Sequence, residues 1–165
     1  MTAGRAENDG DRPERLRRLD RVYLPSPVYF VTACTADRKP ILASEQVYDA
    51  LLDYAATGPQ HGAWIGAFVL MPDHIHFFVA LDEEKVPLSP FVKSLKNALS
   101  KALRRIAISS PHWQKGFFDH VLRSEESYDE KWQYVRDNPV RAGLAPSWDA
   151  WPFKGEIHPL DARRS

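Results

Sequence analysis

The stretch Phe68-Val-Leu-Met-Pro-Asp-His-Ile-His-Phe-Phe-Val-Ala80 is the most apolar part of the chain. Its two ends are continuous apolar runs, a pattern typical of strands that are buried on both faces. Met71-Pro-Asp73 interrupts the run, and a proline there indicates a turn between two strands. Because alternate side chains of a strand share a face, we expect His74 and His76 to point the same way and Ile75 to point into the core.

The histidine pair has two interpretations. Two neutral imidazoles side by side on a rigid strand supply two ligands of a metal site. A His-x-His pair alone is a weak signal, and two ordinary histidines on a half-exposed strand are the alternative. The apolar surroundings favour the metal site, because buried polar groups need partners.

The composition is that of one globular domain. The chain has 165 residues, of which 44% are hydrophobic and 27% are charged, enough for a sizeable core. Its one cysteine, Cys34, excludes a disulfide framework and a cysteine zinc cluster. No apolar run approaches ~20 residues, so we expect no membrane span and a soluble cytoplasmic protein. The 22 basic and 22 acidic residues cancel, which argues mildly against nucleic-acid binding unless the charge is segregated.

Apolar periodicity divides the chain into an arm, a domain and a tail. Residues 1–22 are polar and are expected to form a flexible arm. Period-two and β-branched patterns predict strands at 28–35, 63–70, 74–81 and 116–122. Helical spacing predicts helices at 44–56, at 88–108 and, last, from Ser124 or Ser127 to about Asn138.

The order strand–helix–strand–strand–helix–strand predicts the fold. It is the split βαβ pattern of ferredoxin-like α+β domains, an antiparallel sheet with helices on one face. We expect this domain at 23–144, with the last helix as an addition. That helix should stop near Asn138, because Pro139 disfavours helical geometry in the residue before it. Aromatic residues of the tail, 145–165, are expected to cap the core, with stacking on bases as the alternative; they are Trp148, Trp151 and Phe153.

The second long helix has a basic face that the neutral total conceals. Between Phe91 and Arg105 there are five basic residues and no acid. This face is either an ordinary solvated helix face or a surface that positions phosphates. Its members are Lys93, Lys96, Lys101, Arg104 and Arg105.

Tyr134 and Asn138 lie one turn apart on the last helix and should be surface neighbours on one flank. Together with the histidine pair, several segments resemble the REP-associated tyrosine transposases, a branch of the single-tyrosine HUH transposases (His, hydrophobic, His). The resemblance covers about Val28 to Leu144. The segments that carry it are Tyr29-Phe-Val-Thr32, Met71-Pro-Asp-His-Ile-His76, Trp113-Gln-Lys-Gly-Phe-Phe-Asp-His120, Leu122-Arg123 and Tyr134-Val-Arg-Asp-Asn-Pro-Val-Arg-Ala-Gly143.

This resemblance implies a metal-dependent transposase that nicks and rejoins single-stranded DNA folded into imperfect hairpins, such as REP-like repeats. In the family a tyrosine attacks a backbone phosphate, which gives a 5′-phosphotyrosyl enzyme and a free 3′-hydroxyl. By position Tyr134 matches that nucleophile, and His74 and His76 match the metal ligands. Asn138 stands where relatives place a third, amide ligand. This donor set fits Mg²⁺ or Mn²⁺, and it also suits zinc.

The remaining expectations concern DNA contacts and alternatives. Arg123, Trp113 and Gln114 are candidate DNA contacts beside the basic face. His120 would approach the metal or the DNA, or Asp119 would simply hold it in place.

One alternative is a hairpin-binding protein without chemistry on the same fold. Another is an unrelated His-x-His metal hydrolase, which would need more carboxylates near the histidines. Monomer and homodimer both stay open, and the expected location is the cytoplasm, at the nucleoid.

Overall fold

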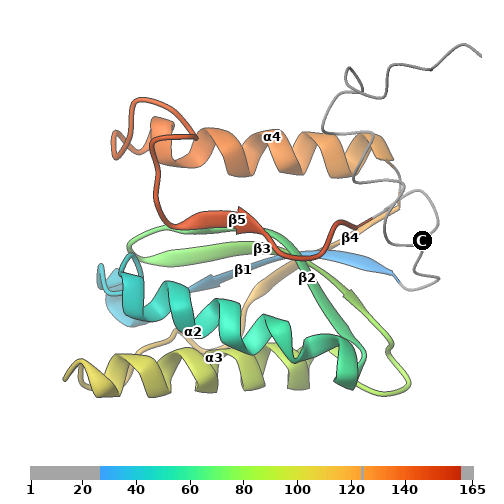
Figure 1. Ribbon diagram of the computed structural model, residues 1–165, viewed down its shortest axis with the longest axis horizontal. Coiled ribbons are helices and arrows are strands. Elements are labelled where there is room, and N and C mark those ends of the chain that lie inside the picture. The colour runs from blue at the N-terminus through green and yellow to red at the C-terminus, as the bar shows by residue number, and fades with distance from the viewer. Residues whose placement is uncertain (1–26, 124, 161–165) are drawn as a thin grey trace, which may run out of the picture.

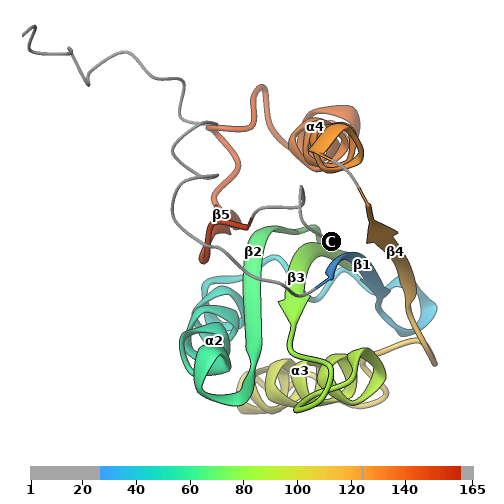
Figure 2. The ribbon, with the colours of Figure 1, turned by 90° about the vertical axis from the view of Figure 1, so that its right-hand side faces the viewer.

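The computed structural model describes residues 27–123 and 125–160. The expected arm at 1–22 and the candidate cap Ser124 lie outside these residues. Five strands form one antiparallel sheet in the order β4-β1-β3-β2-β5 (Figure 2). Their bounds are β1 Val28–Cys34, β2 Ala63–Leu70, β3 His74–Leu81, β4 Phe118–Leu122 and β5 Lys154–Glu156. The first four strands have the predicted ferredoxin-like arrangement, so the predicted fold class is confirmed.

Helices cover both faces of the sheet. Helices α2 (Glu45–Ala56) and α3 (Leu88–Arg105) lie on one face, and α4 (Glu125–Arg141) lies alone on the other (Figure 1). The predicted start of α2 is confirmed, because the Ser44 hydroxyl accepts a hydrogen bond from the Val47 amide at 3.3 Å. Two short 3₁₀ helices, η1 (Ala36–Arg38) and η2 (Gly58–His61), flank α2. Among the described residues, no helix is long and apolar enough to cross a membrane.

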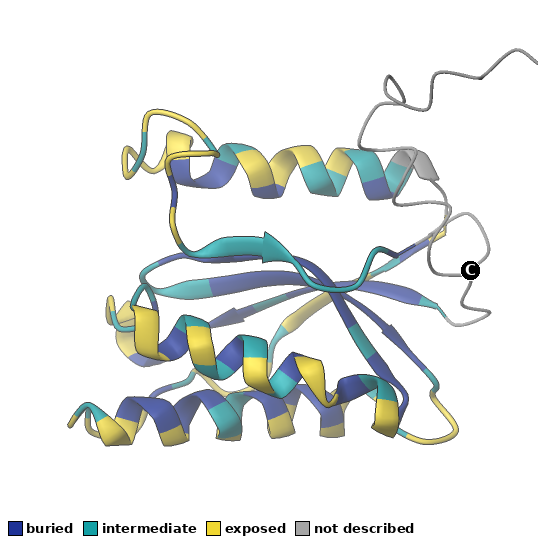
Figure 3. Ribbon diagram, in the orientation of Figure 1, coloured by how far each residue is buried: buried dark blue, intermediate teal, exposed yellow. Residues whose placement is uncertain are grey.

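Strand β3 is central and contributes to a separate apolar cluster on each face. Ile75 and Phe77 belong to the cluster beneath α2 and α3. Phe78 belongs to the cluster beneath α4. In Figure 3 the central strands are mostly buried, and α2, α3 and α4 each carry buried residues among exposed ones. Since His76 alternates with Ile75 and Phe77, the histidine pair faces α4, as the predicted alternation requires.

Helix α4 begins at Glu125, before the Ser127 alternative and directly after Ser124, and it ends later than predicted. Ser127 lies inside the helix and is therefore not its cap. The helix also continues through Pro139 to Arg141. A proline in the last turn removes only one backbone donor, and the chain beyond it closes the helix with a hydrogen bond from the Leu144 amide to the Pro139 carbonyl at 2.9 Å.

The tail contributes a strand that the sequence did not predict. Strand β5 pairs antiparallel with β2 and extends the sheet. Before β5, the Trp151 indole donates a 3.1 Å hydrogen bond to the Leu70 carbonyl. Trp151 is 8% exposed, so its predicted role in capping the core is confirmed. The other strands and helices lie within three residues of their predicted ends.

Candidate active site

The two histidines of β3 lie side by side on the sheet face that α4 covers. Their ring centroids are 4.7 Å apart. His76 is buried and His74 is half-buried. The Phe30 ring of β1 stacks on His76 with a centroid separation of 5.3 Å. The histidine pair therefore contacts an apolar ring on the sheet and faces α4.

Each imidazole is oriented through its Nδ1 atom. His74 Nδ1 donates to the Asp73 carboxylate at 2.8 Å. A 2.7 Å hydrogen bond joins His76 Nδ1 to the Thr32 hydroxyl. The buried Nε2 atom of His76 has no hydrogen-bond partner among the described residues. An imidazole that is held at one nitrogen and leaves the other bare in a dry setting is the arrangement of a metal-ligating histidine.

The electrostatics keep both imidazoles neutral. Burial lowers the pKa of His76 to about 3, and the positive charges of His74, when protonated, and Arg141 act in the same direction. Burial also lowers the pKa of His74, although Asp73 opposes the shift. Burial raises the pKa of Asp73, but its hydrogen bonds to His74 and Arg38 outweigh this and leave the pKa lowered. Neutral imidazole is the form that binds metal ions.

Tyr134 of α4 lies against the histidine pair. Its ring centroid is 5.6 Å from that of His76, with the rings edge to face. Tyr134 is 45% exposed, so its side chain is partly open to solvent. Tyr128 on the same helix is 6% exposed and belongs to the core, as expected. The tyrosine chosen from the sequence is thus the one that the fold brings to the histidines.

Asn138 lies one turn beyond Tyr134 and is buried, at 8% exposure. Among the described residues, no three His, Cys, Asp or Glu side chains are arranged to hold a metal ion. A third protein ligand beside the histidines would therefore have to be of another type, and the Asn138 amide oxygen is such a donor. The bare Nε2 of His76 and this donor set fit a divalent cation.

Positive charge surrounds this site from residues that the sequence analysis missed. The Arg141 guanidinium lies 4.3 Å above the Tyr134 ring and donates to the Tyr134 carbonyl at 3.1 Å. Lys131 lies 5.7 Å from the Phe30 ring. Helical spacing could have found both, because residues 131, 134, 138 and 141 fall on one flank of a helix. Arg38, in contrast, reaches Asp73 from the end of the short 3₁₀ helix η1 and has no such signal.

The predicted basic face is not part of this site. Four of its members are exposed on α3, on the side of the sheet away from α4 (Figure 1). The fifth, Lys96, donates to the backbone carbonyls of Gln114 and Gly116. Trp113 donates to the Lys96 carbonyl and the Ser100 hydroxyl. Lys96 and Trp113 therefore brace the loop before β4.

Asp119 and His120 are neighbours on β4, but their side chains lie on opposite faces of the sheet. His120 pairs with Phe30 and Asp119 with Val31, so their side chains point to opposite faces. The expectation that Asp119 holds His120 in place is therefore wrong. His120 and Arg123 are exposed. Phe118 pairs with Thr32 on the face of the histidines and is 70% exposed, an aromatic group that the sequence reading passed over.

Comparisons with known proteins bear on the family and the fold of the chain. The sequence model of the family described as "Transposase IS200 like" matches residues 26–138. The chain is 26% identical over 138 residues to the REP-associated tyrosine transposase of Escherichia coli K12, covering 81% of this chain and 78% of that protein. A Haemophilus influenzae protein assigned to the same transposase class is 24% identical over 158 residues, which cover 86% of this chain and 90% of that protein.

The fold is also similar to that of a solved structure, a REP-associated tyrosine transposase bound to a REP hairpin. The TM-score is 0.62 at 21% sequence identity, with 88% of this chain and 95% of that chain covered. At this identity the likeness concerns the fold alone.

Proposed function

Because this chain belongs to the IS200-like transposase family, we propose that it cuts and rejoins single-stranded DNA at hairpins, with Tyr134 as the nucleophile. The observation that carries the proposal is the contact between Tyr134 and His76, whose ring centroids are 5.6 Å apart. Hairpin DNA is proposed as the substrate because a relative of the same fold is bound to a REP hairpin.

The first task of such a site is to attract a phosphate. A phosphodiester repels nucleophiles because its oxygens are negative. Arg141 and Lys131 lie on the same flank of α4 as Tyr134 and offer positive charge to those oxygens. The Arg141 guanidinium lies 4.3 Å above the tyrosine ring and would hold the phosphate beside the phenol.

The proposed chemical step is an in-line displacement at phosphorus. A bond forms between Tyr134 Oη and the phosphorus atom as the bond from phosphorus to the 3′-oxygen breaks. The phenol proton passes to solvent, and the departing oxygen takes up a proton to become a 3′-hydroxyl. Attack of a DNA 3′-hydroxyl on the phosphotyrosyl bond reverses the step and releases the tyrosine. Strand transfer thus needs no nucleotide triphosphate.

His74, His76 and Asn138 would hold a divalent cation such as Mg²⁺ or Mn²⁺, which when bound neutralises and orients the scissile phosphate. The hydrogen bonds from His74 to Asp73 and between His76 and Thr32 fix the two imidazole planes beforehand. Preorganisation of this kind reduces the reorganisation that the reaction would otherwise require.

The DNA strand beside the cut would cross β4. Phe118 offers an exposed ring on which an unpaired base can stack, and Arg123 at the end of the strand offers a phosphate contact. Because Tyr134 lies against His76 of its own chain, one subunit would supply both the nucleophile and the histidine ligands.

Covalent capture tests the proposal. Wild-type protein incubated with labelled hairpin DNA and Mn²⁺ should give a protein–DNA adduct that survives denaturing electrophoresis. Tyr134→Phe should give no adduct while still binding the hairpin. Tyr54→Phe, on α2 across the sheet, is the matched control and should react like the wild type. Adducts from Tyr134→Phe would show that another residue is the nucleophile, and binding without adducts across many hairpins would favour a purely DNA-binding protein.

A further inference from the structure

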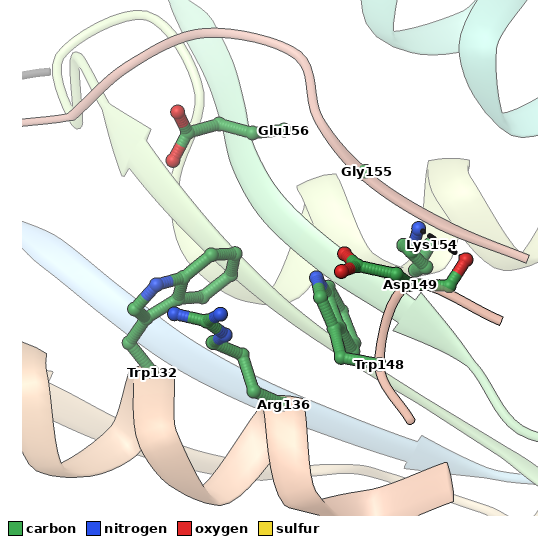
Figure 4. A pocket seen from close by; sticks show the side chains of 7 residues that line it. All are labelled: Trp132, Arg136, Trp148, Asp149, Lys154, Gly155 and Glu156. Carbon is green, nitrogen blue, oxygen red and sulfur yellow. Dashed lines mark hydrogen bonds between the residues drawn. The ribbon is translucent and has the colours of Figure 1, made fainter. Parts of the chain in front are cut away.

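A second site lies between α4 and the chain that leads into β5. It is a pocket of about 320 Å³, at the lower end of the ~300–1,000 Å³ of small-ligand sites. Figure 4 shows that side chains from both segments surround it. The lining side chains are Trp132, Arg136, Trp148, Asp149, Lys154 and Glu156.

Two tryptophans form the aromatic wall of this pocket. Their indole centroids are 5.8 Å apart, with the rings nearly perpendicular. Trp132 is anchored on the core by the Phe78 ring, 6.1 Å away. Lys154 Nζ lies 5.5 Å from the Trp148 ring centroid. Both indoles are only half-buried, so part of each side chain is open to contact with a flat group.

The charges in this pocket have both signs. Arg136 and Lys154 are cationic, and Asp149 and Glu156 are anionic. In Figure 4 the Asp149 carboxylate lies beside the Trp148 ring, and the Arg136 guanidinium lies beside the Trp132 ring. A run of bare phosphates would be repelled by the carboxylates, and an apolar ligand would make no use of the Arg136 and Asp149 charges. A nucleotide with an unpaired base matches the set, because it combines a flat ring, hydrogen-bond donors and one phosphate.

The donor pattern of the bases selects among nucleotides. A carboxylate accepts two parallel hydrogen bonds. The Watson–Crick edge of guanine presents two adjacent donors, the ring N1–H and the exocyclic amino group. Thymine presents only one, and adenine and cytosine present an amino group beside an acceptor, which a carboxylate repels. Asp149 is exposed and can reach such an edge without its own burial cost.

The pocket and the active site share one helix. At about 100° per residue, Trp132 and Arg136 lie on the flank of α4 opposite Tyr134 and Arg141. A DNA strand that crosses α4 can therefore reach both sites. We propose that this pocket binds one unpaired guanine nucleotide of the DNA strand, stacked on Trp148, edge-bound by Asp149 and held at its phosphate by Arg136 or Lys154. This inference rests on the proposed function, because it assumes a single-stranded DNA substrate.

Four oligonucleotides test the base preference. Each is a nine-nucleotide thymine strand whose central base is thymine, guanine, adenine or cytosine, and binding is followed by tryptophan fluorescence and by anisotropy of a labelled strand. Wild-type protein should bind the guanine strand about 5-fold or more tightly than the thymine strand. Trp148→Ala should weaken binding of all four strands by about 5- to 150-fold, and Trp148→Phe should restore most of it.

The carboxylate has a separate test with a matched control. Asp149→Asn should remove the preference for guanine without weakening the thymine strand. Asp53→Asn removes an exposed carboxylate from α2, across the sheet, and should keep the preference. Equal binding of all four strands by the wild type, or a guanine preference that survives Asp149→Asn, would overturn the assignment. Covalent capture separates this failure from that of the proposed function. Adducts with no base preference would refute only the guanine site in the pocket. A base preference without Tyr134 adducts would refute only the cleavage.

Discussion

Replacing His76 by leucine should make the metal-free protein more resistant to acid. His76 is buried and its Nε2 atom has no hydrogen-bond partner among the described residues. A buried polar atom without a partner costs about 1–3 kcal/mol, and the bond to Thr32 contributes about 0.5–1.5 kcal/mol in return. Leucine has a similar volume and no polar atom. At pH 7 we expect His76→Leu to be between neutral and about 2 kcal/mol more stable than the wild type.

The larger effect concerns pH. The pKa of His76 is about 3 in the folded protein and about 6.5 in an unfolded chain. Between these values the unfolded state binds more protons, so folding stability falls as the pH falls. Above about pH 6.5 the neutral His76 causes no loss of folding stability. Between pH 7 and pH 5 it lowers the free energy of unfolding by about 2 kcal/mol. His76→Leu should not show this loss of stability. Because the pKa of His74 is also lowered, the stability of the variant should still fall somewhat as the pH falls.

Urea denaturation at pH 5, 6 and 7 in the presence of a chelator measures these differences. His61→Leu, at an exposed position in η2, is the matched control and should keep the wild-type slope. If His76→Leu loses as much stability from pH 7 to pH 5 as the wild type does, the buried neutral imidazole is not the source of the acid sensitivity.

Three further results are expected. Mn²⁺ at a hundred times its Kd should stabilise the wild type by about 2.7 kcal/mol but should not stabilise His76→Leu. Calorimetry would measure the Tm shift of each protein, and equal shifts in the two would exclude His76 as a ligand. Arg141→Ala should slow adduct formation by Tyr134 about 10- to 100-fold in a gel-based time course, and an unchanged rate would remove Arg141 from phosphate binding. Gly58→Ala should destabilise the fold by about 1–3 kcal/mol or more, because the new methyl group would collide with the Ala63 carbonyl oxygen; an unchanged urea midpoint would contradict that clash.

Local pattern was enough to predict most of the fold. Alternation placed Ile75 in one core and the two histidines on the opposite face, because strand geometry fixes the direction of successive side chains. Helical spacing placed Tyr134 and Asn138 together for the same kind of reason. Strand β5 was missed because Lys-Gly-Glu has neither β-branched residues nor alternation, and only its pairing with β2 makes it a strand.

What the tertiary structure alone decided is which surfaces meet. The sequence offered a basic face on α3 as the DNA surface, but the fold places α3 across the sheet from the histidines. Whether Tyr134 would approach His76 within its own chain depended on the sheet face that α4 covers, and no local pattern encodes that choice. It follows from long-range packing, because the apolar stripe of α4 and the tail around Trp151 bury the same sheet face. Sequence therefore determined the chemical groups, and packing between distant segments determined their partners.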